Sequence, residues 1–371
     1  MATVNLKHLN KIYPSNKGSV HAVKDLNMQI ADGEFVALLG PSGCGKTSTL
    51  RMVVGLEDIT SGTVAFNDVV VNELPPEKRN VAMAFETYAL YPNFTVSENI
   101  GFPLEVRGIE IGQRKKKVEE IAGMLQITEL LGHKPTQLSG GQQQRVSLGR
   151  ALIRDPDVFI LDEVLSHLDA HLKFQMLFEL KRIHQSLGKT MIFVTHDQME
   201  ALALADRVAV MADAELQQFG DRNDLYHKPA NKFVADFIGE PATNFMKASL
   251  LHEKGKYVMK CGNGDLGLYP DEERCAAMEK YKIIEATIGI RPQNISLNPV
   301  KPVKQGCNFK GEVLINEFLG ERSILEVQCG EILLKVLAPP QTGLRRGDII
   351  SLHYHPRDVM IFHLQTEKFI N

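Results

Sequence analysis

The sequence predicts an α/β domain with a mostly parallel β-sheet, followed by a smaller all-β domain. In the first 235 residues, short apolar runs are each followed by turn residues and a helical pattern. Such continuous apolar runs are typical of parallel strands whose two faces are both covered. Clear examples are residues 34–39, 157–161 and 191–195. Between about residues 88 and 153 the pattern is helical throughout, which indicates an inserted helical subdomain.

The pattern changes after residues 229–239. From there on, short segments of alternating hydrophobicity are separated by Gly and Pro turns, which is typical of a small β-barrel. The clearest of these segments are residues 310–315, 323–327 and 332–336. We therefore expect two domains, residues 1–235 and 236–371, with the helical insertion in the first.

Composition and charge exclude several classes of protein. The 371 residues have a net charge of −3, from 42 basic and 45 acidic side chains, so electrostatics give no support for nucleic-acid binding. The five cysteines include no C-x-x-C pair, which argues against a zinc site or a disulfide framework and fits a reducing cytosol. We expect no signal peptide, because the N-terminal residues lead straight into a strand-like pattern. We expect no membrane span, because no apolar run approaches the ~20 residues that cross a bilayer. If the protein works at a membrane, another subunit provides the span.

Residues 40–47, called the phosphate loop below, match G-x-x-x-x-G-K-[ST] between a buried strand and a helix. Glycines let the backbone curl so that its N–H groups point at phosphate oxygens. Lys46 can reach the β and γ oxygens, and Thr47 can bind Mg²⁺. Cys44 is interpreted as tolerated in this loop rather than catalytic. The nucleotide-binding residues predicted here are Gly40, Pro41, Ser42, Gly43, Cys44, Gly45, Lys46, Thr47 and Ser48.

A second feature suited to phosphate, called the signature turn below, lies at residues 138–142. Small residues open a helix there, so free backbone N–H groups, a hydroxyl and the positive end of a helix dipole come together. The residues expected to bind nucleotide are Ser139, Gly140, Gly141 and Gln142. Two such features on one chain indicate a nucleotide that is sandwiched between two subunits.

Acidic and imidazole side chains follow two further buried strands. Asp162 and Glu163 end one apolar run, and His196 follows another. The carboxyl ends of parallel strands face the crevice where such sheets bind ligands. We expect Asp162 to hold Mg²⁺, Glu163 to polarise the attacking water, and His196 to bond the γ-phosphate. Glu163, His196 and Lys46 are thus the predicted catalytic residues.

The order of these four features resembles the nucleotide-binding subunits of ABC transporters. The phosphate loop comes first, then the signature turn, the acidic pair and the histidine. The resemblance implies a P-loop NTPase fold with a RecA-like core and a helical subdomain. It also implies that Tyr13 stacks on adenine, and that the loop at residues 166–169, which includes Asp169, touches the opposite subunit.

The C-terminal part also resembles a known domain. Residues 289–293 and 317–321 are similar to the OB-like regulatory domain of importer ATPases for maltose-type sugars and glycerol-3-phosphate. Together with residues 230–239, the resemblance covers essentially the whole chain. It implies an ATP-binding and ATP-hydrolysing importer subunit that drives uptake of a sugar, polyol or glycerol-phosphate-like solute.

The same resemblance implies a set of partners. Two ATPase subunits, of the same or a homologous chain, would close head to tail around ATP and Mg²⁺, and closure would drive two transmembrane permease subunits. An extracytoplasmic solute-binding protein would deliver the solute, and this chain would be a peripheral protein at the cytoplasmic face of the bacterial inner membrane. Residues 88–92 resemble the groove for the permease's coupling helix, with a buried hinge against the helical subdomain as the alternative.

Three positions depart from the family pattern. Glu86 stands where glutamine is usual, Val164 where proline is usual, and His167 where asparagine is usual. Glu86 could bind Mg²⁺, but an ionised carboxylate has only acceptors and adds negative charge near a polyanion. The departures leave three interpretations open: a slower homodimer, a heterodimer with a second, more conventional ATPase, or a variant held in an ATP-bound state.

Other functions remain as alternatives. Importers of polyamines or ferric iron use similar ATPases. Soluble ABC-type ATPases that act on DNA or ribosomes usually have two cassettes, long coiled coils or basic arms, and this chain shows none of them. The C-terminal domain could also bind a regulatory protein, for which the sequence gives no specific indication.

Overall fold

The computed structural model describes residues 2–370 except 16–17, 86, 254–255, 263–265, 282 and 298–307. The chain divides into two compact units, Met1–Arg222 and Asn223–Asn371. This division precedes the expected boundary at residue 235, because helix α8 (Lys232–Phe237) packs within the second unit. There Ala235 shares a small core with Met360 and Phe362.

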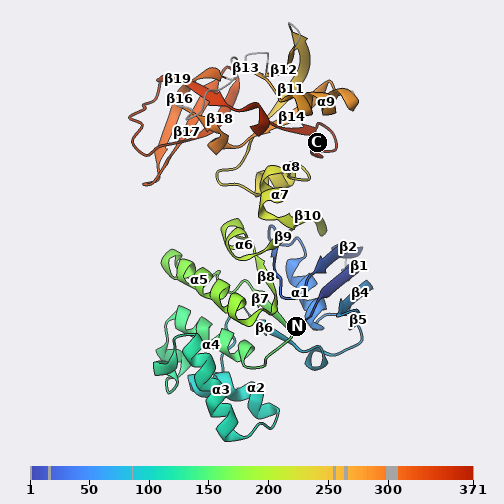
Figure 1. The fold of residues 1–371 in the computed structure, drawn as a ribbon, viewed down its shortest axis with the longest axis vertical. Helices are drawn as coiled ribbons and strands as arrows, with labels where there is room; N and C mark the ends of the chain where they lie inside the picture. Colours follow the sequence, from blue (N-terminus) through green and yellow to red (C-terminus); the bar gives the residue numbers. More distant parts are fainter. Residues whose placement is uncertain are drawn as a thin grey trace. The chain divides into compact units, whose positions relative to one another are not determined.

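A six-stranded sheet forms the centre of the first unit (Figure 1). Its strands are, in spatial order, β10 (Glu215–Asp221), β9 (Arg207–Ala212), β3 (Phe35–Leu39), β8 (Thr190–Thr195), β7 (Val158–Asp162) and β6 (Val81–Ala84). All neighbours are parallel except β10, which pairs antiparallel with β9. Strands β3, β7 and β8 are almost fully buried, as their continuous apolar sequences predict. Three strands that the sequence predicts are therefore central neighbours in one sheet.

A second, antiparallel sheet belongs to the same unit. Its order is β2 (Gly18–Ile30), β1 (Val4–Ser15), β4 (Ser61–Phe66) and β5 (Val69–Val70). Helix α1 (Lys46–Val54) lies with both sheets in one hydrophobic core, which includes Val4, Val36 and Leu50. Helices α5 (Ala170–Leu187) and α6 (Gln198–Leu204) are also part of this unit. The phosphate loop is thus anchored at both ends, by β3 and by α1.

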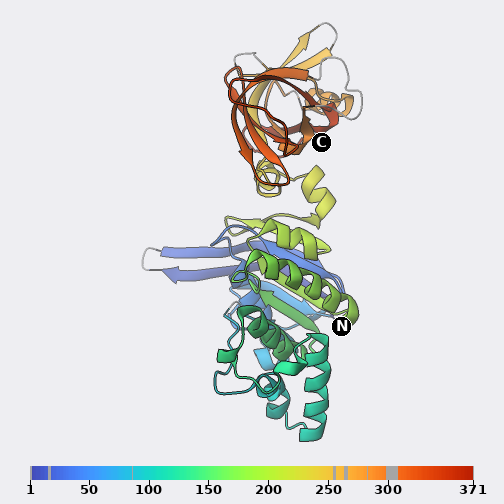
Figure 2. The ribbon, with the colours of Figure 1, turned by 90° about the vertical axis from the view of Figure 1, so that its left-hand side faces the viewer.

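Three helices form a separate lobe of the first unit, called the helical lobe below (Figures 1 and 2). They are α2 (Val96–Val106), α3 (Ile111–Met124) and α4 (Gly140–Leu152), with short 3₁₀ turns at Thr128–Leu130 and Pro135–Gln137. Helix α2 packs against both α3 and α4. Two of the helices begin with capping boxes, formed by Thr95 with Glu98 and by Ser139 with Gln142.

The second unit is mostly antiparallel sheet, and Figure 2 shows its strands curling into a partial barrel. One sheet has the order β13 (Leu266–Leu268), β12 (Lys256–Cys261), β11 (Asn244–Glu253), β14 (Glu285–Ile290) and β20 (Met360–His363). The other has the order β15 (Ile295–Ser296), β19 (Ile349–Tyr354), β16 (Asn308–Phe318), β17 (Ser323–Cys329) and β18 (Ile332–Ala338). The remaining helices are α7 (Arg222–His227) and α9 (Glu272–Lys280), with short 3₁₀ turns at Pro292–Asn294 and Pro356–Asp358.

Both C-terminal sheets contribute to one hydrophobic core, in which Ile288 lies with Leu325 and Leu352. The predicted architecture, an α/β domain with a mostly parallel sheet followed by a smaller all-β domain, is confirmed. Within the parts of the chain described here, no helix is both long and apolar enough to span a membrane.

Candidate active site

The phosphate loop connects β3 to α1 and keeps its shape because two positions cannot hold a side chain. A Cβ at Gly40 would lie 2.3 Å from the Met211 carbonyl oxygen, and one at Gly45 would lie 2.2 Å from the Ala22 carbonyl oxygen. Gly45 also has φ 103°, which favours glycine, and it precedes the first turn of α1. The loop therefore presents the backbone N–H groups at the start of α1, which is an arrangement suited to an anion.

Lys46 lies under this loop. Its side chain is only 4% exposed, and its Nζ donates to the carbonyl oxygens of Gly40 at 2.8 Å and Pro41 at 2.9 Å. A buried ammonium with two neutral acceptors is well placed to exchange one of them for a phosphate oxygen. Burial raises the pKa of the neighbouring Cys44 thiol, which keeps it protonated and agrees with a non-catalytic role.

Strands β3, β8 and β7 end side by side, which brings the predicted catalytic residues to one edge of the sheet. Leu39 pairs with Thr195, and Val194 pairs with Asp162, so the three strand ends are in register. Asp162 is the last residue of β7 and is half-buried. The phosphate loop, the acidic pair and the histidine thus follow three neighbouring strands, as the sequence predicts.

Glu163 and His196 lie in direct contact. Oε2 of Glu163 is 3.3 Å from Nδ1 of His196, and it also accepts a hydrogen bond from the Ser166 hydroxyl at 3.3 Å. The backbone of Glu163 has φ 47°, an unusual value for a residue with a side chain, and its N–H donates to the Val194 carbonyl at 3.0 Å. The fold therefore fixes Glu163 in one orientation towards the histidine.

Tyr13 and Ser48 meet at the edge of the phosphate loop. The Tyr13 hydroxyl donates to Oγ of Ser48 at 3.3 Å, and Nζ of Lys11 lies 4.8 Å from the centre of the Tyr13 ring. The half-buried ring comes from β1, so the antiparallel sheet places an aromatic surface beside the start of α1. Such a surface suits a purine base next to the phosphates.

The signature turn begins helix α4 in the helical lobe and not beside the phosphate loop (Figure 1). The exposed Ser139 is the N-cap: its N–H donates to Oε1 of Gln142 at 2.9 Å, and its hydroxyl accepts from the Gln142 N–H at 3.4 Å. At Gly141 a Cβ would lie 2.4 Å from Cδ2 of Leu172, so glycine lets α4 approach the start of α5.

Asp169 caps the helix that follows the acidic pair. Its Oδ1 accepts from the Leu172 N–H at 3.0 Å at the start of α5. The predicted subunit-contact loop at residues 166–169 therefore leads directly into a capped helix. Glu86 lies outside the described residues, so its expected place beside a metal has no structural account.

Comparisons with known proteins place the chain in a family. Residues 23–166 match the family model for the ABC transporter, and residues 288–362 match the model for the TOBE domain. The chain is 41% identical to the sulfoquinovosyl glycerol transport ATP-binding protein SmoE of Agrobacterium fabrum, over 100% of both chains. It is also 41% identical to the trehalose/maltose import ATP-binding protein MalK of Thermococcus litoralis, again over 100% of both. The chain belongs to the ABC transporter ATP-binding proteins.

Solved structures of ABC cassettes agree with this assignment. The ATP-binding cassette MJ0796, in a dimeric post-hydrolysis state bound to ADP and Pi, matches with a TM-score of 0.53 and 32% identity. The match covers 59% of this chain and 98% of that one. The predicted ABC family and the ATPase activity are thereby confirmed, and nucleotide is the ligand of the first unit.

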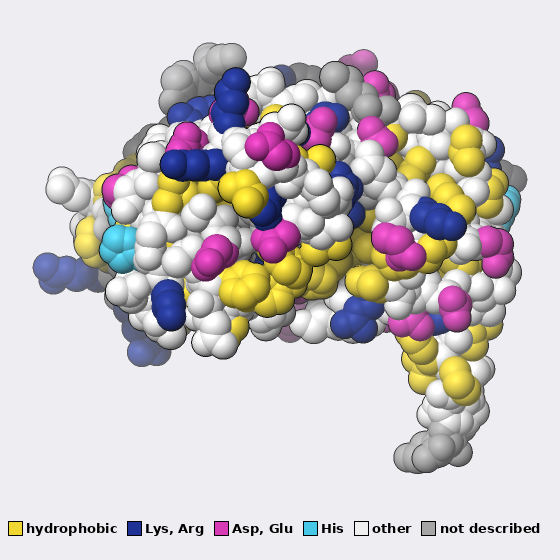
Figure 3. Space-filling model, turned by 90° about the horizontal axis from the view of Figure 1, so that it is seen from below, with side chains coloured by type: hydrophobic (Ala, Val, Ile, Leu, Met, Phe, Trp, Pro, Cys, Tyr) yellow, Lys and Arg dark blue, Asp and Glu magenta, His cyan; other side chains and the backbone are white. Residues whose placement is uncertain are grey.

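A groove in this ABC ATPase lies between the central sheet and the helical lobe. Its volume is about 590 Å³, and its lining includes Phe85, Tyr91 and Phe102. Figure 3, which views the molecule from the end that carries the helical lobe, shows hydrophobic side chains gathered among charged ones on this face. The predicted segment 88–92 borders the groove through Ala89 and Tyr91.

Several residues that shape this groove were not predicted from the sequence. Arg150, in α4, donates from Nη1 to the Ala89 carbonyl at 2.5 Å and from Nη2 to the Tyr88 carbonyl at 2.9 Å, while the Ser147 hydroxyl donates to Tyr88 at 3.0 Å. Tyr88 and Ala89 have φ 57° and 46°, so these contacts hold a strained turn. The sequence signal for Arg150 is weak, because a basic residue in the last turn of a helix is common.

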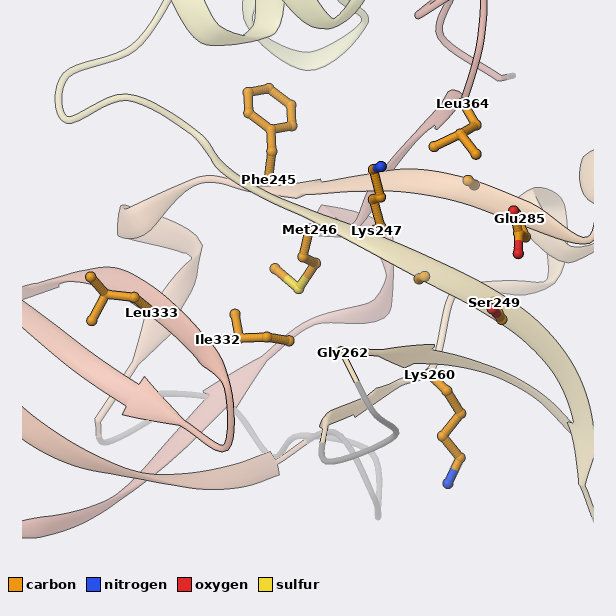
Figure 4. Close-up of a pocket in the computed structure, with 12 residues that line it drawn as sticks. Phe245, Met246, Lys247, Ser249, Lys260, Gly262, Glu285, Ile332, Leu333 and Leu364 are labelled. Atoms are coloured by element: carbon orange, nitrogen blue, oxygen red, sulfur yellow. The ribbon is translucent and has the colours of Figure 1, made fainter.

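A separate cavity of about 410 Å³ belongs to the second unit (Figure 4). Lys247 on β11, Lys260 on β12 and Glu285 on β14 line it together with the apolar Ile332 and Leu333. It combines both signs of charge and includes none of the predicted nucleotide-binding residues. The cavity therefore shares no residue with the predicted nucleotide site of the first unit.

Proposed function

We propose that this chain hydrolyses ATP to drive uptake of a sugar, polyol or glycerol-phosphate-like solute through partner permeases. Support comes from SmoE, named for sulfoquinovosyl glycerol transport, and MalK, named for trehalose/maltose import. Both relatives are 41% identical to this chain over its whole length, which includes the OB-like second unit. A polyamine or iron importer is the alternative within the same mechanism.

The observation that carries the proposal is the contact between Glu163 and His196 at 3.3 Å, at strand ends beside the phosphate loop. The Glu163 carboxylate would accept a proton from the attacking water, and His196 would donate a hydrogen bond to a γ-phosphate oxygen. Lys46 would compensate the charge of the β- and γ-phosphates from beneath the loop. The three roles thus belong to residues of one compact unit: Lys46 is the buried cation, Glu163 is the oriented base, and His196 is the donor to phosphate.

The donor set at the strand ends also fits Mg²⁺. Among the described residues there is no group of three or more His, Cys, Asp or Glu side chains that could hold a metal. In nucleotide sites Mg²⁺ commonly needs only one or two carboxylates, because substrate phosphates and waters complete its shell. The Thr47 hydroxyl and the Asp162 carboxylate would hold the ion, and Glu86 is a further candidate from the sequence alone. Bound there, Mg²⁺ would neutralise charge on the phosphates.

The capped starts of two helices would serve the partner subunit. Ser139 and Gly140 at the start of α4 would contact the nucleotide on the opposite subunit, with Gly141 and Gln142 shaping that turn. Asp169 and its loop would contact the same subunit, and Tyr13 would stack on the adenine of its own nucleotide. The exposure of Ser139 and Asp169 leaves both available for such contacts.

The groove beside the helical lobe would receive the permease. Its lining is apolar and aromatic and also includes Arg107, Arg150 and Arg154. Such a groove suits an amphipathic helix with acidic or carbonyl groups at its ends. The chain would then work as a peripheral protein at the cytoplasmic face of the membrane, with an extracytoplasmic binding protein on the other side. A buried hinge of the helical lobe is the structural alternative for residues 88–92.

A heterodimer with a second ATPase is the other candidate arrangement. Val164, which departs from the family pattern, is buried, and its carbonyl accepts a hydrogen bond from the Gln144 side chain of α4. His167 is exposed in the subunit-contact loop. With Glu86, these residues would alter the site that binds this chain's own ATP while leaving its signature turn intact.

The decisive experiment is ATP hydrolysis by the full chain and by its Glu163→Gln variant. The variant should bind ATP but hydrolyse it about 10²- to 10⁴-fold more slowly, because the amide cannot accept the proton from water. Glu119→Gln, at an exposed carboxylate of α3, is the matched control and should leave the rate unchanged. A Glu163→Gln variant that hydrolyses ATP at the wild-type rate would refute the assigned role. Uptake of labelled maltose, glycerol-3-phosphate and putrescine by cells with and without the chain separates the solute classes.

A further inference from the structure

A buried ionic cluster connects the first turns of α5 and α6. Nζ of Lys173, in α5, lies 2.7 Å from Oε1 of Glu200 and 3.1 Å from Oδ2 of Asp197. Glu200 is only 2% exposed and the Lys173 side chain is 25% exposed. A carboxylate buried to this extent needs partners, so removing Lys173 would leave the charge of Glu200 buried and unpaired, which costs free energy of folding.

Glu200 fixes the turn that contains His196. Its other oxygen accepts a hydrogen bond from Oγ1 of Thr195 at 2.5 Å, and Thr195 in turn accepts one from the Asp197 N–H at 3.0 Å. Asp197 also caps α6, because its Oδ1 accepts from the Glu200 N–H at 3.3 Å. The residues immediately before and after His196 are therefore both tied to the carboxylate that Lys173 holds.

The electrostatics agree with a charged cluster. Burial alone would raise the pKa of Asp197, but hydrogen bonds from Lys173 and from the start of α6 outweigh it and lower that pKa. Burial alone would lower the pKa of Lys173, yet its bonds to Glu200 and Asp197 raise it. Lys173 therefore remains charged, and Asp197 ionised, at neutral pH.

The other end of the cluster is the subunit-contact loop. Lys173 lies one helical turn after Asp169, and its N–H donates to the Asp169 carbonyl at 2.8 Å. Asp169 also caps this first turn of α5 through its side chain. The loop at residues 166–169 is therefore joined to Lys173 through the first turn of α5, and Lys173 is joined through Glu200 to the turn at His196.

A second lysine of α5, which also pairs with a carboxylate, shows what is different about Lys173. Lys181, two turns further along α5, donates to the Leu204 carbonyl at 2.6 Å and lies 3.3 Å from Asp206. Leu204 is the last residue of α6 and Asp206 follows that helix, at the opposite end of α6 from His196. Both lysines join α5 to the same segment, but only the partners of Lys173 flank the histidine.

We propose that Lys173 and Glu200 are positioning residues for ATP hydrolysis, which hold the His196 turn against α5 so that the loop at Asp169 sets the place of His196 beside Glu163. The inference rests on the proposed roles of His196 and Glu163. It connects the Asp169 loop, where a second subunit is expected to bind, with the place of the histidine.

The test compares kcat and KM for ATP in the full chain carrying Lys173→Met or Lys181→Met. Lys173→Met should lower kcat about tenfold or more with KM changed by less than about twofold, because a shift of about 1 Å in a positioned group can cost up to 10²-fold. Lys173→Arg should restore most of the lost rate, since it restores the charge and the donors. Lys181→Met should leave kcat within about twofold of wild type. Equal losses in the two methionine variants, or an unchanged kcat in Lys173→Met, would overturn the proposal.

Glu200→Gln covers the case in which Lys173→Met fails to fold. The amide keeps a bond to Thr195 but loses the charge, so kcat should fall without a change in KM. Lys173→Met should lower kcat much less in the Glu200→Gln background than in the wild-type chain, because the effects of coupled residues are not additive. Additive losses would contradict the coupling. Glu163→Gln, measured beside them, separates the two hypotheses. If it retains activity, the proposed catalytic role of Glu163 fails; if only Lys173→Met and Glu200→Gln retain activity, only this inference fails.

Discussion

At the scale of single residues, the two glycines with positive φ in the phosphate loop should respond differently to alanine. Gly45 has φ 103° and a Cβ there would lie 2.2 Å from a backbone carbonyl, whereas Gly43 has φ 81° and open space around it. We expect Gly43→Ala to lower the free energy of unfolding by about 1–2 kcal/mol, the strain of a left-handed residue. Gly45→Ala should cost clearly more, because the backbone itself must move. Urea unfolding without nucleotide measures both, and equal losses would show that the loop relaxes around Gly45.

Glu86 gives a second prediction at this scale, argued from its chemistry alone. A carboxylate near the triphosphate adds like charge, and it offers no N–H to a water or phosphate oxygen. Glu86→Gln should therefore raise the ATPase rate of the assembled transporter. Glu119→Gln, at an exposed carboxylate of α3 outside the groove, serves as the control. An unchanged or lower rate in Glu86→Gln would mean that Glu86 does not restrain turnover.

At the scale of elements, the contact between α4 and the start of α5 can be tested by adding and then removing volume. A methyl group at Gly141 would lie 2.4 Å from Cδ2 of Leu172, so Gly141→Ala should push the signature turn away from α5 and lower the ATPase rate about tenfold. Leu172→Ala removes the clashing atoms, and the double variant should recover much of that rate. If the double variant is as slow as Gly141→Ala, the methyl group acts on the nucleotide and not on the helix contact.

The strands of the first unit were predictable from sequence patterns, whereas several side-chain contacts of its helices were not. The strands before Gly40 and His196 and the one ending at Asp162 were predictable, because a fully buried parallel strand needs an uninterrupted apolar run. The contact of Glu163 with His196 follows from the register of those strands. Lys173 and Arg150 were not predictable, because a helical lysine or arginine is usually solvated, and only the tertiary packing shows which carboxylates and carbonyls it meets.

At the scale of the whole molecule, the division into two units was predictable from the change in pattern, but its place was not. A short helix such as α8 has no sequence signal for the unit on which it packs. Arg291 shows why it belongs to the second: its guanidinium donates to the Ala235 carbonyl at 3.2 Å and to the Tyr226 carbonyl at 2.7 Å. Burial lowers the pKa of Arg291 to about 10, which is still far enough above neutrality to keep it charged.

The proposed head-to-tail dimer can be tested by mixing two inactive variants of the chain. If each ATP contacts Lys46 of one subunit and Ser139 of the other, Lys46→Ala and Ser139→Ala homodimers have both sites damaged. In a mixed dimer both defects fall in one site, and the other site is intact. Mixing equal amounts of the two variants should then restore about a quarter of the wild-type ATPase rate, since half of the dimers are mixed and each has one intact site of two. Unmixed variants, measured at the same total concentration, give the baseline. Activity that stays at this baseline would show that Ser139 serves its own chain's nucleotide, or that this chain works only beside a different ATPase.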